Sequence, residues 1–108
     1  MSENFLNSAR NVSLQDGRRL VAELQNQNGE YVHAEMYLDD VLGNSEGRFE
    51  WGGENFILSA RDVRLEFEED GTQPVLLAIL LDENDDLRSA MFYLSERIFN
   101  ENGAFVFR

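Results

Sequence analysis

The chain has no cysteine, so it can form no disulfide, no cysteine-ligated zinc site and no thiolate nucleophile. Basic residues are also scarce, because 9 Lys and Arg stand against 21 Asp and Glu, for a formal net charge of −12. A nucleic-acid binder needs a cationic surface to displace counterions, and anionic membranes attract the same kind of surface. We therefore expect neither nucleic acid nor a membrane among the partners.

Long apolar runs are lacking as well. The longest, VLLAILL at 75–81, is the size of a strand and too short to span a bilayer. The start, MSENFLNSAR, has neither the basic nor the apolar region of a secretory signal. We therefore expect the protein in the cytoplasm, or outside the cell by a non-classical route. The only proline, Pro74, lies where we expect a loop.

What the chain does have is apolar and repeated. Hydrophobic residues make up 43% of 108 residues, enough for one core, so we expect a single domain over 1–108. The stretch FLNSARNVSL at 5–14 returns as FILSARDVRL at 56–65, and we expect it to be the first strand of each copy. The second copy then carries five extra residues, after which positions 56 apart match, as in Leu20 with Leu76 and Leu24 with Leu80. A solenoid needs about three repeats, so two copies favour one pseudo-symmetric domain.

Within each copy, apolar residues alternate with polar ones, which is the pattern of half-buried strands. In YVHAEMYL, Val32, Ala34 and Met36 share one face. Asn28-Gly29 predicts a tight hairpin turn, and RFEW and AFVFR predict short strands after glycine turns. The stretches 39–44 and 95–100 are typical of single helical turns, with Asp39 and Ser95 as N-caps. The pattern as a whole predicts an all-β protein.

These motifs carry a family resemblance over essentially the whole chain. The repeat, and above all YVHAEMYLDDVLGNSEGRFEW followed by GGENF, resembles the cyanovirin-N homologue domain. The resemblance implies two pseudo-symmetric halves, each a three-stranded antiparallel sheet plus a β-hairpin with short helical turns. Because the halves exchange hairpins, half A would hold residues 1–40 plus 97–108, and half B residues 41–96.

The resemblance also implies a function. We expect a carbohydrate-binding lectin for mannose-type, α1→2-linked oligosaccharides such as high-mannose glycans, with one shallow polar pocket in each half. In half A the site residues would be Asn4, Asn7, Ser8, Gln25, Gln27, Asn100, Glu101 and Asn102. In half B they would be Asn44, Glu54, Asn55, Ser59, Asp82 and Glu83. Amides and hydroxyls both donate and accept hydrogen bonds, as sugar hydroxyls do, and this favours half A. In half B, acidic and apolar residues such as Leu58 and Glu83 replace polar or basic ones of the family, so binding there is open.

Two further expectations follow from the resemblance. Family members whose halves are stapled by disulfides would have cysteines at Ala9 with Leu24, and at Ala60 with Leu80, where this chain pairs a small and a large apolar residue. Members can also form domain-swapped dimers through the hinge, here Trp51–Asn55. Its two glycines make it flexible, so we expect mainly a monomer.

Other interpretations of the same residues stay open. A module that kept the fold and lost sugar binding is the alternative, favoured by the acidic half B, and an enzyme is the least supported. His33 is alone, and we interpret it as a solvated surface residue rather than a catalytic base. The acidic runs at 66–70 and 82–86 lack the spacing of a calcium loop, so we expect no metal and no cofactor. Trp51 alternates with Phe49, which favours core packing over stacking on a sugar.

Overall fold

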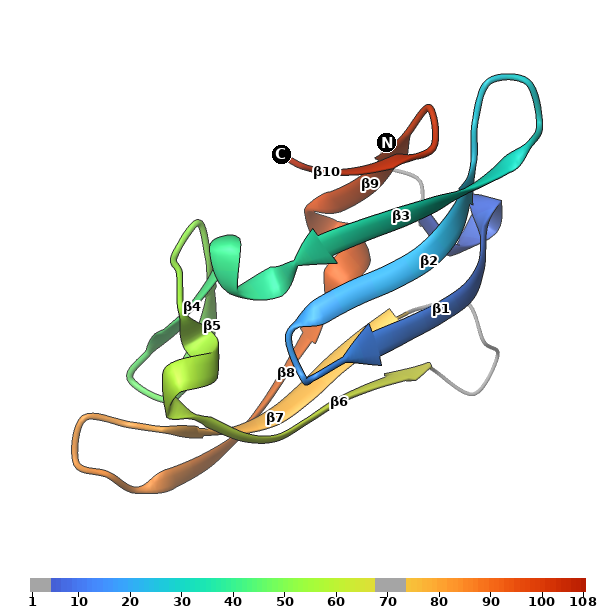
Figure 1. The fold of residues 1–108 in the computed structure, drawn as a ribbon. Helices are drawn as coiled ribbons and strands as arrows, with labels where there is room; N and C mark the ends of the chain where they lie inside the picture. The colour runs from blue at the N-terminus through green and yellow to red at the C-terminus, as the bar shows by residue number, and fades with distance from the viewer. Residues whose placement is uncertain (1–4, 68–73) are drawn as a thin grey trace.

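The computed structural model describes residues 5–67 and 74–108, and within them the chain forms short strands and 3-10 turns (Figure 1). In the first copy, η1 spans Phe5–Ser8, β1 Ala9–Gln15, β2 Arg19–Gln25, β3 Tyr31–Tyr37, η2 Leu38–Asp40, β4 Leu42–Ser45 and β5 Arg48–Trp51. In the second copy, η3 spans Phe56–Ser59, β6 Ala60–Phe67, β7 Pro74–Leu81, β8 Leu87–Tyr93, η4 Leu94–Glu96, β9 Ile98–Glu101 and β10 Ala104–Phe107. The predicted all-β class is confirmed. No helix among the described residues is long and apolar enough to cross a membrane.

The strands form two three-stranded antiparallel sheets, ordered β1-β2-β3 and β6-β7-β8, and two hairpins, β4-β5 and β9-β10. The hairpin from the end of the chain contacts the first sheet, through β10 with β3 and β9 with η1, while β5 contacts β8 and β4 contacts η3 (Figure 1). Equivalent aromatic pairs join these parts, since Phe5 packs on Phe105 at 5.4 Å between ring centroids and Phe56 on Phe49 at 5.6 Å. The predicted boundaries of the two halves stay a prediction.

The core follows from the period-two alternation. In β2, Leu20, Ala22 and Leu24 point inward and are buried, and in β7 Leu76, Ala78 and Leu80 do the same. Trp51 packs against this core and stacks on Phe92, with ring centroids 5.1 Å apart. Its ring is therefore engaged in packing, as the alternation predicts.

The positions that the resemblance assigns to disulfides lie opposite one another on neighbouring strands. Ala9 pairs with Leu24 between β1 and β2, and Ala60 pairs with Leu80 between β6 and β7. Both strands then bulge at equivalent places, where Asn11 and Asp62 have φ of 55° and 52°. The two sheets thus share the same irregularity as well as the same register.

Two predicted helical turns are wrong in extent and in their caps. The turns η2 and η4 are only three residues long, Asp39 and Ser95 lie inside them, and Tyr37 and Tyr93 hold the N-cap positions. The residues that follow form β4 and β9 instead, because the turns at 46–47 and 102–103 have positive φ at both residues and close two-residue hairpins. Asp39 is buried and pairs with Arg18 at 3.0 Å.

Two other local expectations also need correction. The openings FLNS and FILS are the 3-10 turns η1 and η3, so the first strand of each copy begins only at Ala9 and at Ala60. Pro74 is not in a loop, because it is the buried first residue of β7 and pairs with Phe67. A proline is tolerated at the first residue of a strand, where it interrupts the fewest ladder hydrogen bonds.

Candidate functional site

Two equivalent loops form the centre of the candidate sites, and one side chain caps each of them. In the β2–β3 loop, Asn26 Oδ1 accepts hydrogen bonds from the backbone N–H groups of Asn28 at 2.9 Å and Glu30 at 3.0 Å. In the β7–β8 loop, Asp82 Oδ1 accepts from Asn84 and Asp86, both at 2.9 Å. The expected turn at Asn28-Gly29 is present, but Asn28 is not among the residues with positive φ, whereas Gly29 has φ of 79°. A side-chain cap, more than the Asn-Gly pair, therefore sets the loop shape.

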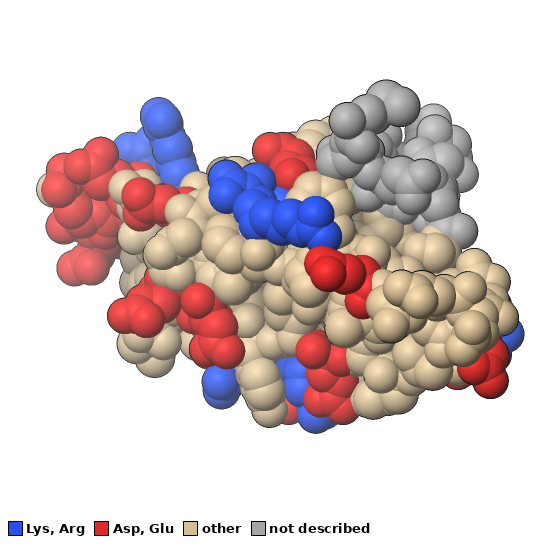
Figure 2. All heavy atoms as spheres, turned by 90° about the horizontal axis from the view of Figure 1, so that it is seen from above, with Lys and Arg blue, Asp and Glu red and all other residues tan. Residues whose placement is uncertain are grey.

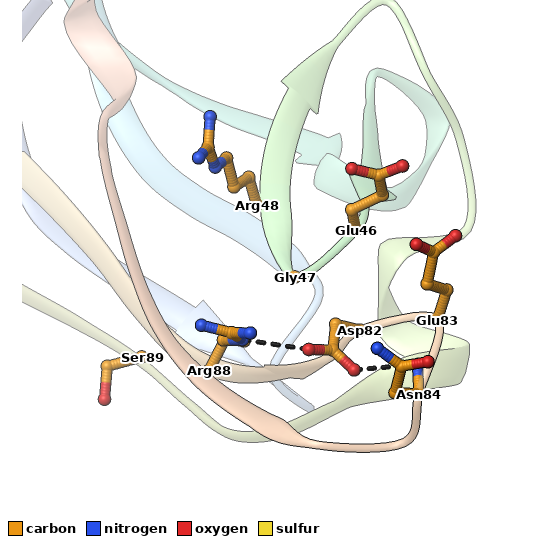
Figure 3. Close-up of a pocket in the computed structure, with 8 residues that line it drawn as sticks. All are labelled: Glu46, Gly47, Arg48, Asp82, Glu83, Asn84, Arg88 and Ser89. Atoms are coloured by element: carbon orange, nitrogen blue, oxygen red, sulfur yellow. Dashed lines mark hydrogen bonds and ion pairs between the residues drawn. The ribbon is translucent and has the colours of Figure 1, made fainter.

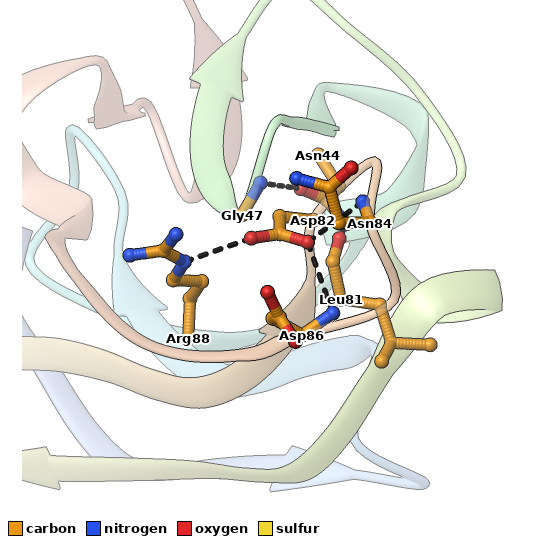
Figure 4. A network of polar contacts seen from close by, with 7 residues as sticks. All are labelled: Asn44, Gly47, Leu81, Asp82, Asn84, Asp86 and Arg88. Carbon is orange, nitrogen blue, oxygen red and sulfur yellow. Dashed lines mark hydrogen bonds and ion pairs between the residues drawn. The ribbon is translucent and has the colours of Figure 1, made fainter.

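A second side chain ties each hairpin turn to its sheet. In half A, Asn100 Nδ2 donates to Ser8 Oγ at 2.8 Å and to the Gln25 carbonyl at 2.9 Å, and Gly103 N–H donates to Asn100 Oδ1 at 2.8 Å. In half B, Asn44 makes the same contacts, some of which Figure 4 shows. Its Nδ2 donates to Ser59 Oγ at 2.7 Å and to the Leu81 carbonyl at 2.8 Å, and its Oδ1 accepts from the Gly47 N–H at 2.8 Å. Both amide hydrogens of each asparagine are thus engaged, so these residues position the site, and their direct contact with a sugar stays a prediction.

The structure brings several predicted residues of half A together. Gln27 N–H donates to Asn102 Oδ1 at 2.9 Å, which joins the β2–β3 loop to the β9–β10 turn. Gln25 Nε2 donates to the Gly29 carbonyl at 3.2 Å inside the same loop. Glu101 points to Arg108 instead, with which it pairs at 2.6 Å. Asn4 lies outside the described residues, and Asn7 is described only as part of η1, without its side chain.

In half B, a hollow of about 290 Å³ collects four of the six predicted residues: Asn44, Ser59, Asp82 and Glu83. Glu54 and Asn55 do not line it, and Asn55 instead has a left-handed φ of 62° and donates its N–H to the Asp39 carbonyl at 2.7 Å. The lining also includes Glu46, Leu81 and Asp85. Glu46 and Asp85 were not among the predicted residues, although the repeat places them at the positions of Asn102 and Gly29 of half A.

The repeat shows that half B has exchanged neutral groups for acids around its loop. Asn26, Gln27, Gly29 and Asn102 of half A correspond to Asp82, Glu83, Asp85 and Glu46. In Figure 2, acidic side chains gather densely at the end of the molecule where Figure 1 places the β4–β5 and β7–β8 turns. The two sites thus share a backbone frame and differ in charge.

The charge of Asp82 is held in place by an ion pair (Figure 4). Its Oδ2 accepts from Arg88 Nε at 2.9 Å, with the Asp82 side chain only 5% exposed and that of Arg88 60% exposed. The hydrogen bond from Arg88, followed by that from the Asp86 N–H, lowers the pKa of Asp82 below its ordinary value. Asp82 is therefore ionised at neutral pH and anchors one wall of the hollow.

The remaining candidates have simple surroundings. His33 is 63% exposed, and its Nε2 lies 2.5 Å from Glu35 Oε2. The hydrogen bond to His33 is the main cause that lowers the pKa of Glu35. Within 5–67 and 74–108, no group of three or more His, Asp or Glu side chains is placed to hold a metal ion. The acidic residues at 68–70 lie outside the described residues.

Comparison with known proteins agrees with this architecture. The family model of the CVNH domain matches residues 5–106. The chain belongs to the CVNH domain family. A cyanovirin-N homologue of Neurospora crassa is 36% identical over 96 residues, which cover 87% of this chain and 86% of that protein. The solved structure of the CVNH protein of Gibberella zeae is 44% identical, covers 96% of both chains and superposes with a TM-score of 0.90.

Two other solved structures with this fold contain sugars. A complex of microvirin with mannobiose is 26% identical, covers 98% of this chain and 99% of that one, and has a TM-score of 0.88. A variant of MoCVNH3 in complex with (N-GlcNAc)4 is 27% identical, covers 98% and 97% of the two chains, and has a TM-score of 0.84. Relatives of this CVNH chain with the same fold therefore bind mannose-containing and N-acetylglucosamine-containing saccharides.

Proposed function

We propose that this CVNH chain is a lectin that binds mannose-type oligosaccharides with α1→2 linkages, mainly through half A. The observation that carries the proposal is the junction of the β2–β3 loop with the β9–β10 turn, where Gln27 N–H meets Asn102 Oδ1 at 2.9 Å. This junction places the Asn102 side chain against the backbone of the β2–β3 loop, although the two segments lie 75 residues apart in the sequence. Neutral amides donate and accept at once, which suits the hydroxyls of a neutral sugar. The sugar complexes of microvirin and of the MoCVNH3 variant support a saccharide ligand.

We further propose that binding involves no catalysis. The residues of half A would hold the sugar by hydrogen bonds from Gln25, Gln27 and Asn102, while Asn100 and Ser8 hold the turn in position. A shallow site of this kind gives weak affinity, so a glycan that engages both halves gains from multivalency.

The test is a titration followed by the amide NMR shifts of the whole chain. With α1→2 mannobiose and mannotriose, shifts at 25–29 and 100–103 are expected, and cellobiose serves as the control sugar. The double variant Gln27→Glu with Asn102→Glu gives half A the two acids of half B and should abolish these shifts. Its matched counterpart, Glu83→Gln with Glu46→Asn, gives half B the amides of half A and should add shifts at 44–47 and 82–85.

The acidic exchange in half B favours one competing function, an interaction module that has lost sugar binding. This alternative predicts that millimolar mannobiose leaves the spectra of the natural chain and of both variants unchanged. That result would overturn the lectin proposal.

A further inference from the structure

Half B carries a second hollow next to the one already described (Figure 3). Its volume is about 410 Å³, and it lies between the β4–β5 turn and the start of β8. The two hollows share Glu46, Asp82 and Glu83, so they form one groove that passes the turn. The second hollow adds Gly47, Arg48, Asn84, Arg88 and Ser89.

Two guanidinium groups distinguish this end of the groove. The Arg48 side chain is exposed and makes no ion pair or hydrogen bond with any described residue, so all five of its N–H groups are available. Arg88 uses Nε for Asp82 and keeps its terminal N–H groups for a further acceptor. A guanidinium matches a planar carboxylate with two parallel hydrogen bonds.

The arginine pair is specific to half B. By the repeat, Arg48 and Arg88 correspond to Ala104 and Val32 of half A, and Ser89 corresponds to His33, which is paired with Glu35. The backbone frame is the same, because a Cβ added at Gly47 would lie 2.6 Å from Arg88 Cγ, and one added at Gly103 would lie 2.5 Å from Val32 Cγ2. The start of the Arg88 side chain thus lies beside Gly47 as Val32 lies beside Gly103, and its guanidinium adds a positive charge that half A lacks at this position.

The opposite charges lie on different sides of the groove. In Figure 3, the carboxylates of Glu46 and Glu83 lie to one side of Gly47, and the guanidinium groups of Arg48 and Arg88 lie to the other. The lining contains two arginines and three acids, so a ligand with two or more negative charges is disfavoured by Glu46 and Glu83. A single carboxylate placed at the arginines avoids that repulsion.

We propose that the groove of half B binds a saccharide that carries a single carboxylate, on one uronate unit. The carboxylate lies between Arg48 and Arg88 and accepts their free N–H groups. The hydroxyls of the same or the next sugar unit then face Ser89 and Asn84, or reach over the turn to Ser59. The saccharide part of the inference rests on the proposed lectin function, and the carboxylate part rests on the arginines alone.

The test compares methyl galacturonoside, which carries one carboxylate, with its methyl ester, which has the same hydroxyls and no charge. Titration of the full chain with methyl galacturonoside should shift the amides of residues 46–48 and 88–89 and leave 25–29 and 100–103 unchanged, while the ester should leave all of them unchanged. Added salt should weaken the binding. The variant Arg48→Ala, which gives the residue found in half A and breaks no described contact, should lower the affinity about tenfold or more.

A second variant removes the other arginine and so tests the carboxylate site independently of Arg48. Asp82→Asn together with Arg88→Val installs the pair of half A without stranding a buried charge, and it should lower the affinity by a similar factor in a folded chain. The inference is overturned if Arg48→Ala binds methyl galacturonoside as well as the natural chain does, or if the ester produces the same shifts. Mannobiose shifts in half A, recorded on the same samples, test the lectin proposal separately, so the two can fail independently.

Discussion

At the scale of single residues, Asp82 and Asn26 perform the same structural task with different charge. Each uses one oxygen to cap its loop, at 2.9 to 3.0 Å from two backbone N–H groups. The other terminal atom of the two side chains differs. Asp82 Oδ2 accepts a hydrogen bond from Arg88 at 2.9 Å, whereas the residue of half A that corresponds to Arg88 is Val32. The loop shape therefore tolerates either pair, provided that charge and counter-charge change together.

This pairing predicts a pH dependence of stability in half B. The hydrogen bond from Arg88 lowers the pKa of Asp82 in the folded chain. The ionised Asp82 therefore adds to the free energy of unfolding above its unfolded pKa of about 3.9, and this stabilisation is lost as the pH falls through the lower folded pKa. In Asp82→Asn the loop cap remains and the titration is gone, so the fall in stability below about pH 4 should be shallower. Urea unfolding of both chains between neutral and acidic pH measures it.

The matched control lies in half A. Asn26→Asp creates a carboxylate that keeps two backbone N–H donors but faces Val32 in place of an arginine, so the steepening of the acid-induced loss of stability in this variant should be smaller than the loss of steepness in Asp82→Asn. If the free energy of unfolding falls equally steeply below about pH 4 in Asp82→Asn and in the natural chain, the ionisation of Asp82 does not stabilise the fold.

At the scale of elements, the pairing of β1 with β2 makes a specific chemical prediction. Ala9 lies opposite Leu24, and directly opposed residues of antiparallel strands have Cα separations of about 4.5–5.5 Å, within the range of a disulfide. The double variant Ala9→Cys with Leu24→Cys should therefore oxidise to an intramolecular bridge. The oxidised form should gain about 2–4 kcal/mol over its own reduced form, because the unfolded chain is constrained.

Unfolding in urea with and without reductant measures this difference. Ala60→Cys with Leu80→Cys is the internal control, since that pair has the same register in the second sheet. Failure of both pairs to oxidise in the folded chain would contradict the register of the two sheets.

The same elements show how far the sequence alone leads. Strands β2, β3, β7 and β8 were predictable because their apolar residues alternate and bury one face. The strands β4 and β9 were not, because LGNS and IFNE are four residues long and take strand geometry from the hairpin turn that follows them. The ties of Asn44 to Leu81 and of Asn100 to Ser8 span 37 and 92 residues, so no local pattern reports them. The neutral character of the half A site was predictable from its residue types. The proximity of Arg48 and Arg88 in half B was not, because it results from the packing of β8 against the β4–β5 turn.

At the scale of the whole molecule, the segment between β5 and η3 links the two copies and is held by contacts between backbones. Gly52 N–H donates to the Val41 carbonyl at 2.9 Å, and Asn55 N–H donates to the Asp39 carbonyl at 2.7 Å. Gly53 passes so close to Gly43 that a Cβ added at Gly53 would lie 2.9 Å from Gly43 Cα and N. We propose that these contacts favour the closed monomer over a domain-swapped dimer.

The proposal predicts a change of oligomeric state from one methyl group. In Gly53→Ala, the new Cβ would collide with backbone atoms that cannot rotate away, so the closed segment loses stability relative to an extended one. When the segment is extended, the hairpin β4–β5 of one chain packs against the sheet β6-β7-β8 of a second chain instead of its own. The dimer fraction of the variant should therefore rise with concentration. Gly52→Asn is the control, because a Cβ at Gly52 meets nothing within 4 Å and asparagine tolerates its φ of 81°. Size-exclusion chromatography with light scattering separates the outcomes, and a Gly53→Ala chain that stays as monomeric as Gly52→Asn would show that this close approach does not control the exchange of halves.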